Sequence, residues 1–350
     1  MKKHSKKLKF IGLIVTILVS NFIFINLNFE AEFVNNDDLP KCQYTKNVKK
    51  SYKNEINDFN LSYAQIEENF KKRSIILDQG RSFTSTNNLC DSNGIKFKKI
   101  ALIIPYRDRE ENLRRFLFNM HPILKRQKIN YGIYLIEPTQ DSQFNRGIIL
   151  NAGFIEVIKE SVNDKKLNPL GINDFYWDCF IFHDVDMIPE DERLMYTCDE
   201  KYPLHLAVTR RSNNYSYTGY FKNYYGGINA FTPRQFIGIN GFSNQYFNWG
   251  FEDDDLRERV RFKFNQVVKI PQKIGRIFTD LHERSDRNPY RKILFKFLFS
   301  KLKKYGRALE GLETVKYQFN GKEPHFLFTK IKISYNLADY SKQMNYLKKV

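Results

Sequence analysis

The sequence has few cysteines and lacks the motifs of several common protein classes. Its four cysteines, Cys42, Cys90, Cys179 and Cys198, form no C-x-x-C pair, and no H-x-x-x-H pair occurs, so the spacing argues against a zinc site. No G-x-G-x-x-G follows the first predicted strand, which argues against a dinucleotide-binding fold. Zinc-finger spacing, a helix-turn-helix signature and basic runs beside stacking aromatic residues are also absent, so we expect no nucleic-acid partner.

Acidic residues are scarce relative to basic ones. The chain has 57 Lys and Arg against 39 Asp and Glu, a formal net charge of +18, and the excess is spread along the sequence. A basic field of this kind favours acidic partners such as nucleotide phosphates or an anionic membrane. With 350 residues, 42% of them hydrophobic, the chain is long enough for one large catalytic domain with or without a stem.

A long apolar run begins at residue 8, and its only charge is Lys9. The run LKFIGLIVTILVSNFIFINLNF has about the length of one bilayer crossing. Lysines before it predict a cytoplasmic N-terminus and a lumenal C-terminal part. A cleaved signal peptide is the alternative, but the run exceeds the usual apolar region and no A-x-A pattern follows. We therefore predict a cytoplasmic tail at 1–9 and a transmembrane signal anchor at 10–29.

The residues that follow this run are polar and rich in Asn, Lys and Ser, which predicts a stem and domain edge at 30–94 and a catalytic domain at 95–345. N-glycosylation acceptor motifs at Asn60 and Asn214 agree with a lumenal location. An even number of cysteines in a lumenal protein suggests two disulfides with three possible pairings, and four free thiols are the alternative.

Apolar patterning from residue 99 onward alternates between strands and helices. Strands are predicted at 99–105, 131–138 and 175–183, and helices at 107–127 and 144–160. This order predicts an α/β fold with a mostly parallel sheet covered by helices. Ligands bind such folds outside the carboxyl ends of the strands.

Two aspartates, Asp184 and Asp186, follow the third predicted strand directly. With one residue between them they point to the same side of an extended chain, and their charges repel unless a cation lies nearby. A hard divalent cation with oxygen ligands meets that need, and it would make a bound diphosphate a better leaving group. His282 is the best candidate for a further ligand, where an imidazole favours manganese over magnesium. A surface or helix-end histidine is the alternative.

Four consecutive acids, Glu252 to Asp255, follow the aromatic and glycine-rich stretch YFNWGF. The simplest explanation is a helix N-terminus, where acids are favoured, and it is compatible with function. A carboxylate at the mouth of a site can take a proton from an attacking hydroxyl. Trp249 offers a flat face for a sugar ring, and Gly250 lets its loop move and exclude water.

Several long segments resemble the metazoan β-1,4-galactosyltransferase family and occur in that family's order. They cover most of the predicted lumenal part and read IIPYRDREENLRRFL, YGIYLIEPTQDSQFNRGIILNAGF, CFIFHDVDMIPEDERLMYTC, NYYGGINAFTPRQFIGINGFSNQYFNWGFEDDDLRERV and GLETVKY. The resemblance implies a GT-A fold with a mixed, mostly parallel sheet, an inverting transfer that uses manganese and UDP-galactose, and a single-pass type II protein of the Golgi membrane. The family's two disulfides map to Cys42–Cys90 and Cys179–Cys198.

The resemblance also assigns the donor and metal residues. The family's P-F-R-x-R and F-N-R nucleotide-binding motifs match Pro105, Tyr106, Arg107, Arg109, Phe144 and Arg146. Its D-V-D motif matches Asp184, Val185 and Asp186, with Asp186 as the metal ligand. His282 matches the metal histidine, and the family's metal methionine is replaced by Thr279, so that Thr279, Asp280 or a water would supply the third ligand.

The acceptor side follows from the same resemblance. Trp249 matches the loop tryptophan, and the acidic cluster that holds sugar hydroxyls matches Glu252, Asp253 and Asp254, with Asp253 as the catalytic base. Glu252 and Trp249 complete the predicted catalytic group. Arg291 belongs to the stretch Asn-Pro-Tyr-Arg-Lys, which corresponds to the family's acceptor-binding N-P-x-R-F.

The donor sugar is predicted from Tyr224, which precedes Gly226 and Gly227 in the donor site. Family members that use N-acetylgalactosamine have a smaller aliphatic residue at this position. A phenol ring beside the 2-position of the sugar would reject an N-acetyl group sterically, so we expect galactose.

Two further departures from the family pattern bear on the acceptor: Phe251 replaces a glycine of the tryptophan loop and should stiffen it, and Lys292 replaces a phenylalanine. The predicted function is transfer of galactose from UDP-galactose to the 4-hydroxyl of a terminal N-acetylglucosamine on glycoprotein or glycolipid glycans. Within enzymes, the alternatives are a UDP-N-acetylgalactosamine donor or a xylose acceptor. An inactive, lectin-like glycan-binding protein is the alternative of another class.

Overall fold

The computed structural model describes residues 61–73, 75–82, 99–139, 141–163, 176–211, 223–280 and 286–340, together with the backbone of three short strands. Two of these, β1 (Val15–Ile17) and β2 (Ile25–Leu27), pair antiparallel within the segment for which the sequence predicts a transmembrane helix. They are rich in β-branched residues, which suit strands. The rest of that segment lies outside the described residues. Among the residues described, no helix is long and apolar enough to cross a bilayer.

One mixed sheet forms the centre of the described fold, with its strands in the order β12-β8-β11-β6-β4-β5-β15-β14 and β3 paired to β5. The three strands predicted from the sequence, β4, β5 and β6, are parallel as expected, and β15 is parallel to β5. The β8, β11 and β14 strands run antiparallel to at least one neighbour. The strands of this sheet are β3 (Arg81–Ser82), β4 (Lys99–Pro105), β5 (Asn130–Pro138), β6 (Cys179–His183), β8 (Leu204–His205), β11 (Ile228–Phe231), β12 (Val268–Lys269), β14 (Gln318–Pro324) and β15 (Thr329–Ser334).

A second, smaller sheet lies at the end of β6 and has the strand order β10-β9-β13-β7. The sequence pattern did not predict it, because its strands have only two to four residues. Its pairing sets Thr279 opposite Met187, and it therefore brings residue 279 beside the aspartates that follow β6. Its strands are β7 (Met187–Pro189), β9 (Thr209–Arg211), β10 (Tyr217–Thr218) and β13 (Arg276–Thr279).

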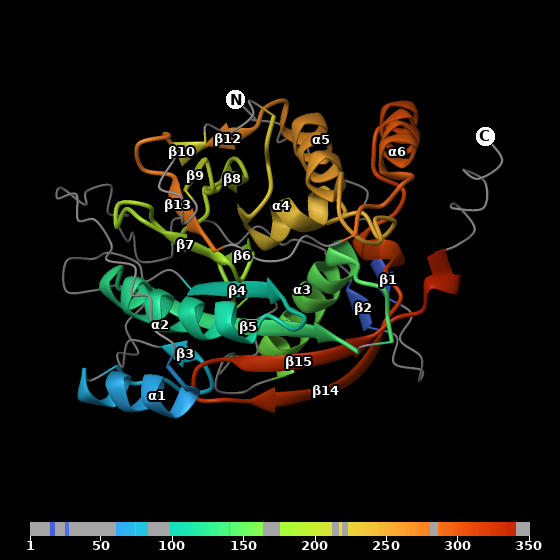
Figure 1. Cartoon of the computed structure of the whole chain (residues 1–350). Coiled ribbons are helices and arrows are strands. Elements are labelled where there is room, and N and C mark those ends of the chain that lie inside the picture. Colours follow the sequence, from blue (N-terminus) through green and yellow to red (C-terminus); the bar gives the residue numbers. More distant parts are fainter. Residues whose placement is uncertain are drawn as a thin grey trace, which may run out of the picture.

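Helices cover both faces of the main sheet (Figure 1). Alternate residues of β4 face opposite ways, so that Leu102 and Ile104 pack in the core under α2, while Ala101 and Ile103 pack in the core under α3. The helices are α1 (Tyr63–Lys72), α2 (Glu110–Arg126), α3 (Arg146–Asn163), α4 (Pro233–Gly238), α5 (Glu252–Phe264) and α6 (Arg291–Tyr305), with the short 3₁₀ helices η1 (Leu312–Thr314) and η2 (Leu337–Tyr340).

Part of the segment predicted as stem and domain edge belongs to the folded domain. Ile66 and Phe70 of α1 are buried in the core under α2. Arg81 of β3 pairs with Gly132 of β5 at the main sheet. The mostly polar composition of 30–94 does not reveal this packing. A short helix needs only one buried residue on each of two successive turns to pack against a core.

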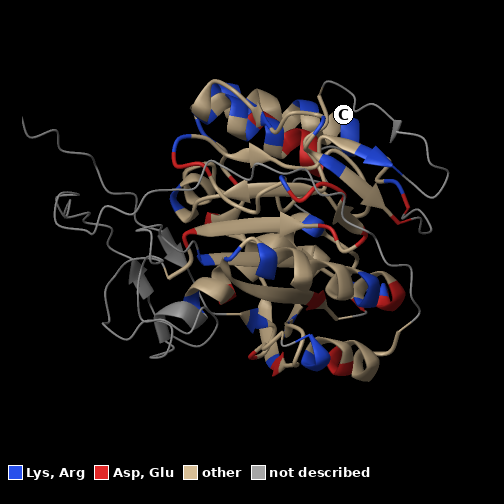
Figure 2. Cartoon of the chain, turned by 90° about the vertical axis from the view of Figure 1, so that its left-hand side faces the viewer, with Lys and Arg blue, Asp and Glu red and all other residues tan. Residues whose placement is uncertain are grey.

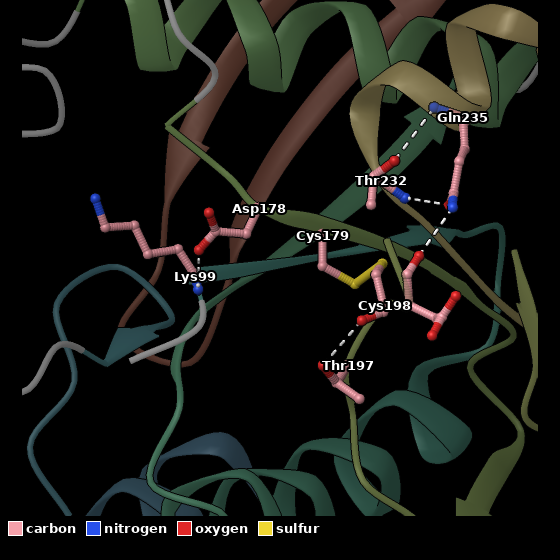
Figure 3. Close-up of a disulfide and its surroundings, with 8 residues drawn as sticks. Lys99, Asp178, Cys179, Thr197, Cys198, Thr232 and Gln235 are labelled. Atoms are coloured by element: carbon pink, nitrogen blue, oxygen red, sulfur yellow. Dashed lines mark hydrogen bonds between the residues drawn. A yellow bond between two sulfur atoms is a disulfide. The ribbon is translucent and has the colours of Figure 1, made fainter. Parts of the chain in front are cut away.

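A disulfide joins Cys179, at the start of β6, to Cys198, which is the pairing that the resemblance implies (Figure 3). Backbone contacts hold both ends of this bridge: Lys99 N donates to Asp178 Oδ2 at 2.9 Å, and Gln235 Nε2 donates to Asp199 O at 2.8 Å. The other predicted pair and the predicted glycosylation sites lie outside the described residues, namely Cys42, Cys90, Asn60 and Asn214.

Candidate functional site

The carboxyl ends of β4 and β6 lie side by side, because the two strands are parallel neighbours in the sheet. Pro105 ends β4, and Asp184 directly follows His183 at the end of β6. The imidazole of His183 bonds to Asp184 O at 2.8 Å and to the Tyr196 hydroxyl at 2.7 Å, so the turn that carries the aspartates is fixed from inside the protein. The predicted donor and metal segments therefore meet at one edge of the sheet.

Arg146, at the start of α3, joins two carboxylates that are far apart in the sequence. Its Nε and Nη2 donate to Asp184 Oδ1 at 3.0 and 2.8 Å, and its Nη1 donates to Asp253 Oδ1 at 3.0 Å. Only 9% of Arg146 is exposed. Burial alone would lower its pKa, but Asp184, Asp253 and Glu252 together raise the pKa above its usual value. Arg146 is thus a permanent cation at the centre of the site.

Asp253 lies in the first turn of α5 with the rest of the acidic cluster. Burial raises the pKa of Asp253 to about 8, Arg146 opposes this shift, and Glu252, Asp184 and Asp254 add to it. Burial likewise raises the pKa of Glu252, whose Oε2 accepts a hydrogen bond from Gly250 N at 3.0 Å. A carboxylate with a pKa near the working pH is well suited to accept a proton from a hydroxyl group.

Two glycines in the loop before β11 allow close approaches, Gly226 to Asp253 and Gly227 to Met187. A Cβ atom at Gly226 would lie 2.3 Å from Asp253 Oδ2 and 2.9 Å from Cε2 of Tyr224. Gly227 has a φ of +81°, and a Cβ atom there would lie 2.5 Å from Met187 Sδ and 3.3 Å from the Tyr224 hydroxyl. The Tyr224 ring therefore lies against the glycine pair, beside Asp253 and Met187.

The metal residues predicted from the sequence are only partly described. Asp280 N donates to Asp186 O at 2.9 Å, which ties the end of β13 to the aspartate turn. The Asp280 carboxylate is bound by Arg115 and, at 3.1 Å, by Asn112 Nδ2, both on α2. His282 lies outside the described residues. Among the residues that are described, no three His, Cys, Asp or Glu side chains form a group that could hold a metal ion.

Thr279 fits the role of third ligand better than Asp280 does. Its Oγ1 is buried and has no hydrogen-bond partner among the residues described, whereas the Asp280 carboxylate is occupied by α2. A hydroxyl and a carboxylate oxygen on neighbouring strand ends are the hard donors that a divalent cation such as manganese accepts. The donor set around Asp186 therefore fits the implied metal.

The predicted nucleotide residues form a second group beside Arg146. The Arg107 guanidinium donates to Thr139 O at 3.2 Å and lies 5.3 Å from the ring centroid of Phe144. The Tyr106 hydroxyl is 3.2 Å from Glu110 Oε2, and Arg109 occupies the N-cap position of α2 without a capping hydrogen bond from its side chain. Arg107 and Phe144 are thus brought together, and Tyr106 is held by α2.

The tryptophan loop is held by α6 and the residues before it. Trp249 N donates to Asp286 O at 2.9 Å, and Asn288 N donates to Trp249 O at 3.1 Å, while 53% of Trp249 remains exposed. Phe251 has a φ of +73°, which is uncommon outside glycine. Its ring lies 5.4 Å from that of Phe295 on α6, next to a small buried cluster. Packing against α6 therefore holds the loop at the position where the family has a glycine.

Sequence reasoning missed three residues that shape the site: Asn112, Arg115 and Lys269. The first two hold Asp280, and Lys269 Nζ donates to Tyr224 O at 2.7 Å. Each is a polar residue on a helix or short strand, and each contacts a residue at least 45 positions away. Local sequence patterns do not predict contacts between residues so far apart in the chain.

Comparison with known proteins shows the family to which the chain belongs. Residues 47–199 match the profile described as the N-terminal region of glycosyl transferase group 7, and residues 205–283 match the N-terminal domain of galactosyltransferase. The chain therefore belongs to glycosyltransferase family 7, and the mixed sheet with flanking helices is the fold of its solved relatives.

Among curated relatives, beta-1,4-galactosyltransferase 4 of Cricetulus griseus is 36% identical over 238 residues, which are 68% of this chain and 64% of that protein. Human beta-1,4-galactosyltransferase 3 is 34% identical over 236 residues, 67% of this chain and 55% of that protein. The chain thus aligns with less than two thirds of the length of these relatives.

Among solved structures, a mutant Drosophila beta-1,4-galactosyltransferase 7 in complex with manganese, UDP-Gal and xylobiose has a TM-score of 0.56 at 25% identity. The match covers 71% of this chain and 98% of that chain. The catalytic domain of the same Drosophila protein with xylobiose gives a TM-score of 0.55.

Proposed function

We propose that this protein is an inverting, manganese-dependent β-1,4-galactosyltransferase that moves galactose from UDP-galactose to the 4-hydroxyl of a terminal N-acetylglucosamine. The observation that carries the proposal is Arg146, which connects the aspartate turn after β6 to Asp253 on α5 within hydrogen-bonding distance. Donor-side and base-side carboxylates therefore share one buried cation, so the two halves of the proposed site lie next to each other.

In the proposed reaction, Asp253 accepts the proton of the acceptor hydroxyl while that oxygen attacks the anomeric carbon from the face opposite UDP. The bond between this carbon and the UDP oxygen breaks, and UDP leaves with the bonding electrons. We assign Arg107 and Arg146 to stabilise the negative charge that develops on the diphosphate. Asp186 and Thr279, with His282, would hold manganese, which when bound neutralises diphosphate charge. Trp249, half exposed on its loop, would cover the sugars and exclude water.

The test is transfer of labelled galactose by the purified chain to a panel of sugar acceptors, with and without manganese. Manganese-dependent transfer to N-acetylglucosamine is the expected result. Glycan binding without any manganese-dependent transfer or UDP-sugar hydrolysis would favour a lectin-like protein instead.

The donor preference is proposed from Tyr224, whose ring lies against Gly226 and Gly227 beside Asp253. Replacing Tyr224 with leucine should open this space and raise transfer of N-acetylgalactosamine relative to galactose. Tyr224→Phe is the matched control, because it keeps the bulk of the ring. If Tyr224→Leu leaves the ratio of the two donors unchanged, the steric argument is wrong.

A xylose acceptor is the second candidate, since the similar Drosophila structure contains xylobiose and Lys292 replaces an aromatic residue at the acceptor stretch. Comparing N-acetylglucosamine with a xyloside at equal concentration separates the two. Faster transfer to xylose would replace our acceptor assignment while leaving the donor assignment intact.

We also propose that the chain is a single-pass type II protein of the Golgi membrane with a lumenal catalytic domain. The support is the apolar run at 10–29 that follows a lysine-rich segment, and the Cys179–Cys198 disulfide, which suits an oxidising compartment. Protease protection of the catalytic domain in sealed Golgi vesicles tests this orientation, and digestion without detergent would contradict it.

A further inference from the structure

Helix α6 carries charges of one sign only. Its sequence, RKILFKFLFSKLKKY, has six Lys and Arg and no Asp or Glu. The other described helices of ten or more residues, α1, α2, α3 and α5, each carry both signs. Figure 2 shows basic and acidic residues mixed over most of the ribbon. Because solvated surfaces normally intersperse both signs, a wholly basic helix indicates a partner of opposite charge.

The charged side of α6 faces away from the protein. Leu294, Leu298 and Leu302 recur every four residues and are buried against the domain. Helical periodicity places Lys296 and Lys303 on the outward side, where both are exposed. The helix therefore has a fixed apolar side and a free basic side.

The lysines of α6 have aromatic neighbours in place of acidic ones. Within the part of the chain that the structure describes, no carboxylate lies within ion-pairing distance of them. Lys303 Nζ instead lies 4.2 Å from the ring centroid of Phe299, and Lys301 Nζ lies 5.3 Å from that of Phe297. Cations beside flat apolar rings suit a sugar chain that bears negative groups, since the rings can contact the sugars while the ammonium groups pair with the charges.

The helix begins at the acceptor side of the site. Arg291 Nη1 donates to Asn288 O at 2.8 Å, and Asn288 N donates to the carbonyl of Trp249. From Arg291 to Lys303 a helix rises about 18 Å, enough to follow several sugar units. A glycan whose end sits below Trp249 can therefore run along α6.

We propose that the outward lysines of α6, namely Lys292, Lys296, Lys303 and Lys304, bind sulfate or carboxylate groups on the acceptor glycan behind its accepting sugar. This rests on the proposed function, because it needs an acceptor in the site. An anionic membrane would also attract these lysines, but anionic lipids concentrate in the cytoplasmic leaflet, and the proposed orientation is lumenal.

The test compares two acceptor tetrasaccharides that differ only in sulfate groups on their internal sugars, using the full-length chain. The variant K296Q/K303Q/K304Q removes three charges outside the catalytic machinery. We expect its kcat/KM to fall about tenfold, or about 1.4 kcal/mol, on the sulfated acceptor and to stay unchanged on the neutral one. The preference of the unmodified chain for sulfate should weaken as salt is added, because exposed charges are screened.

The matched control is K71Q/K72Q/K322Q, which removes the same charge from α1 and β14, away from α6 in Figure 1. Equal losses on both acceptors, or in the control, would overturn the proposal. The proposal would also be overturned if K296Q/K303Q/K304Q kept its preference for the sulfated acceptor but lost binding to phosphatidylserine vesicles. That result would make α6 a membrane-binding surface.

Titration of the sulfated tetrasaccharide without donor separates this proposal from the proposed function. Binding that depends on the α6 lysines without any galactose transfer would refute the proposed function and support the basic face as an anion site. Transfer with no discrimination between the two acceptors would support the function and refute the role of α6.

Discussion

The donor side and the acceptor side of the site are held in different ways. On the donor side, Arg146 is nine-tenths buried and pairs with Asp184, which follows the parallel strand β6, and with Asp253 on α5. On the acceptor side, Trp249 is half exposed, and Phe251 keeps a positive φ through packing on α6. The donor side therefore depends on buried charges at the central sheet. The acceptor side depends on a loop that packs against α6 and its small buried cluster.

This difference shows where the chain can vary without losing its chemistry. A buried ion pair tolerates little change, because removing one partner leaves an uncompensated charge. A loop packed on a surface helix can accept a new residue at modest cost. Two of the three departures from the family pattern, Phe251 and Lys292, lie on the acceptor side, so this side is where we expect the chain's own specificity.

We expect the largest effect from Arg146→Ala. It leaves Asp184 and Asp253 facing each other without their cation, so we expect near-complete loss of transfer and a loss of about 3–5 kcal/mol in the free energy of unfolding. Urea unfolding and kcat/KM measure the two effects. Arg146→Lys keeps the charge and should recover part of the stability. A stable, active Arg146→Ala protein would show that the donor side is not held by this residue.

Asp253→Asn should lower kcat by about 10²- to 10⁴-fold with the fold retained, because it removes the proposed base. Since burial raises the pKa of Asp253 to about 8, the carboxylate becomes protonated as the pH falls through that value. The kcat/KM of the unmodified chain should therefore decline on the acid side, and that decline should vanish in the variant. An identical pH profile in both proteins would exclude Asp253 as the base.

Much of the donor side could be predicted from the sequence. The strands β4, β5 and β6 are apolar runs that end in turn residues, and parallel order fixes which of their ends meet. The bond between Arg146 and Asp253 could not be predicted, because 107 residues separate the partners and only the tertiary fold brings the starts of α3 and α5 together.

The residue opposite the aspartate turn and the packing of the tryptophan loop could not be predicted for another reason. The strands β7, β9 and β13 are too short to show periodicity, so the position of Thr279 opposite Met187 emerged only from pairing. The stiffening expected of Phe251 agrees with its contact with Phe295, but that partner lies on a helix that the sequence pattern did not single out.

Thr279→Val tests the proposed metal ligand on the donor side, and we expect a smaller effect on activity. The substitution keeps the shape of the side chain and removes its buried hydroxyl, so the manganese concentration for half-maximal activity should rise about tenfold. Thr279→Ser is the control that keeps the oxygen. If Thr279→Val responds to manganese as the unmodified chain does, a water or another residue completes the metal site.

Phe251→Gly should have the smallest effect, because it relieves positive-φ strain of about 1 kcal/mol while losing the contact with Phe295. We expect a change of a few fold in the acceptor KM and faster motion of Trp249. The chain has two tryptophans, and Trp177 is buried, so a Trp177→Phe background reports Trp249 fluorescence alone. Unaltered loop kinetics would mean that packing on α6 does not restrain the loop.

The aspartate turn lies inside a covalently closed segment, because Cys179 and Cys198 are 19 residues apart and Asp186 falls between them. Closing a loop of this size restricts the unfolded chain by about 3 kcal/mol. Protein produced in a reducing cytosol would lack this constraint at the strand that precedes the proposed metal ligand Asp186. Chain made in an oxidising compartment should therefore keep its donor affinity, and treatment with a thiol reductant should progressively abolish it.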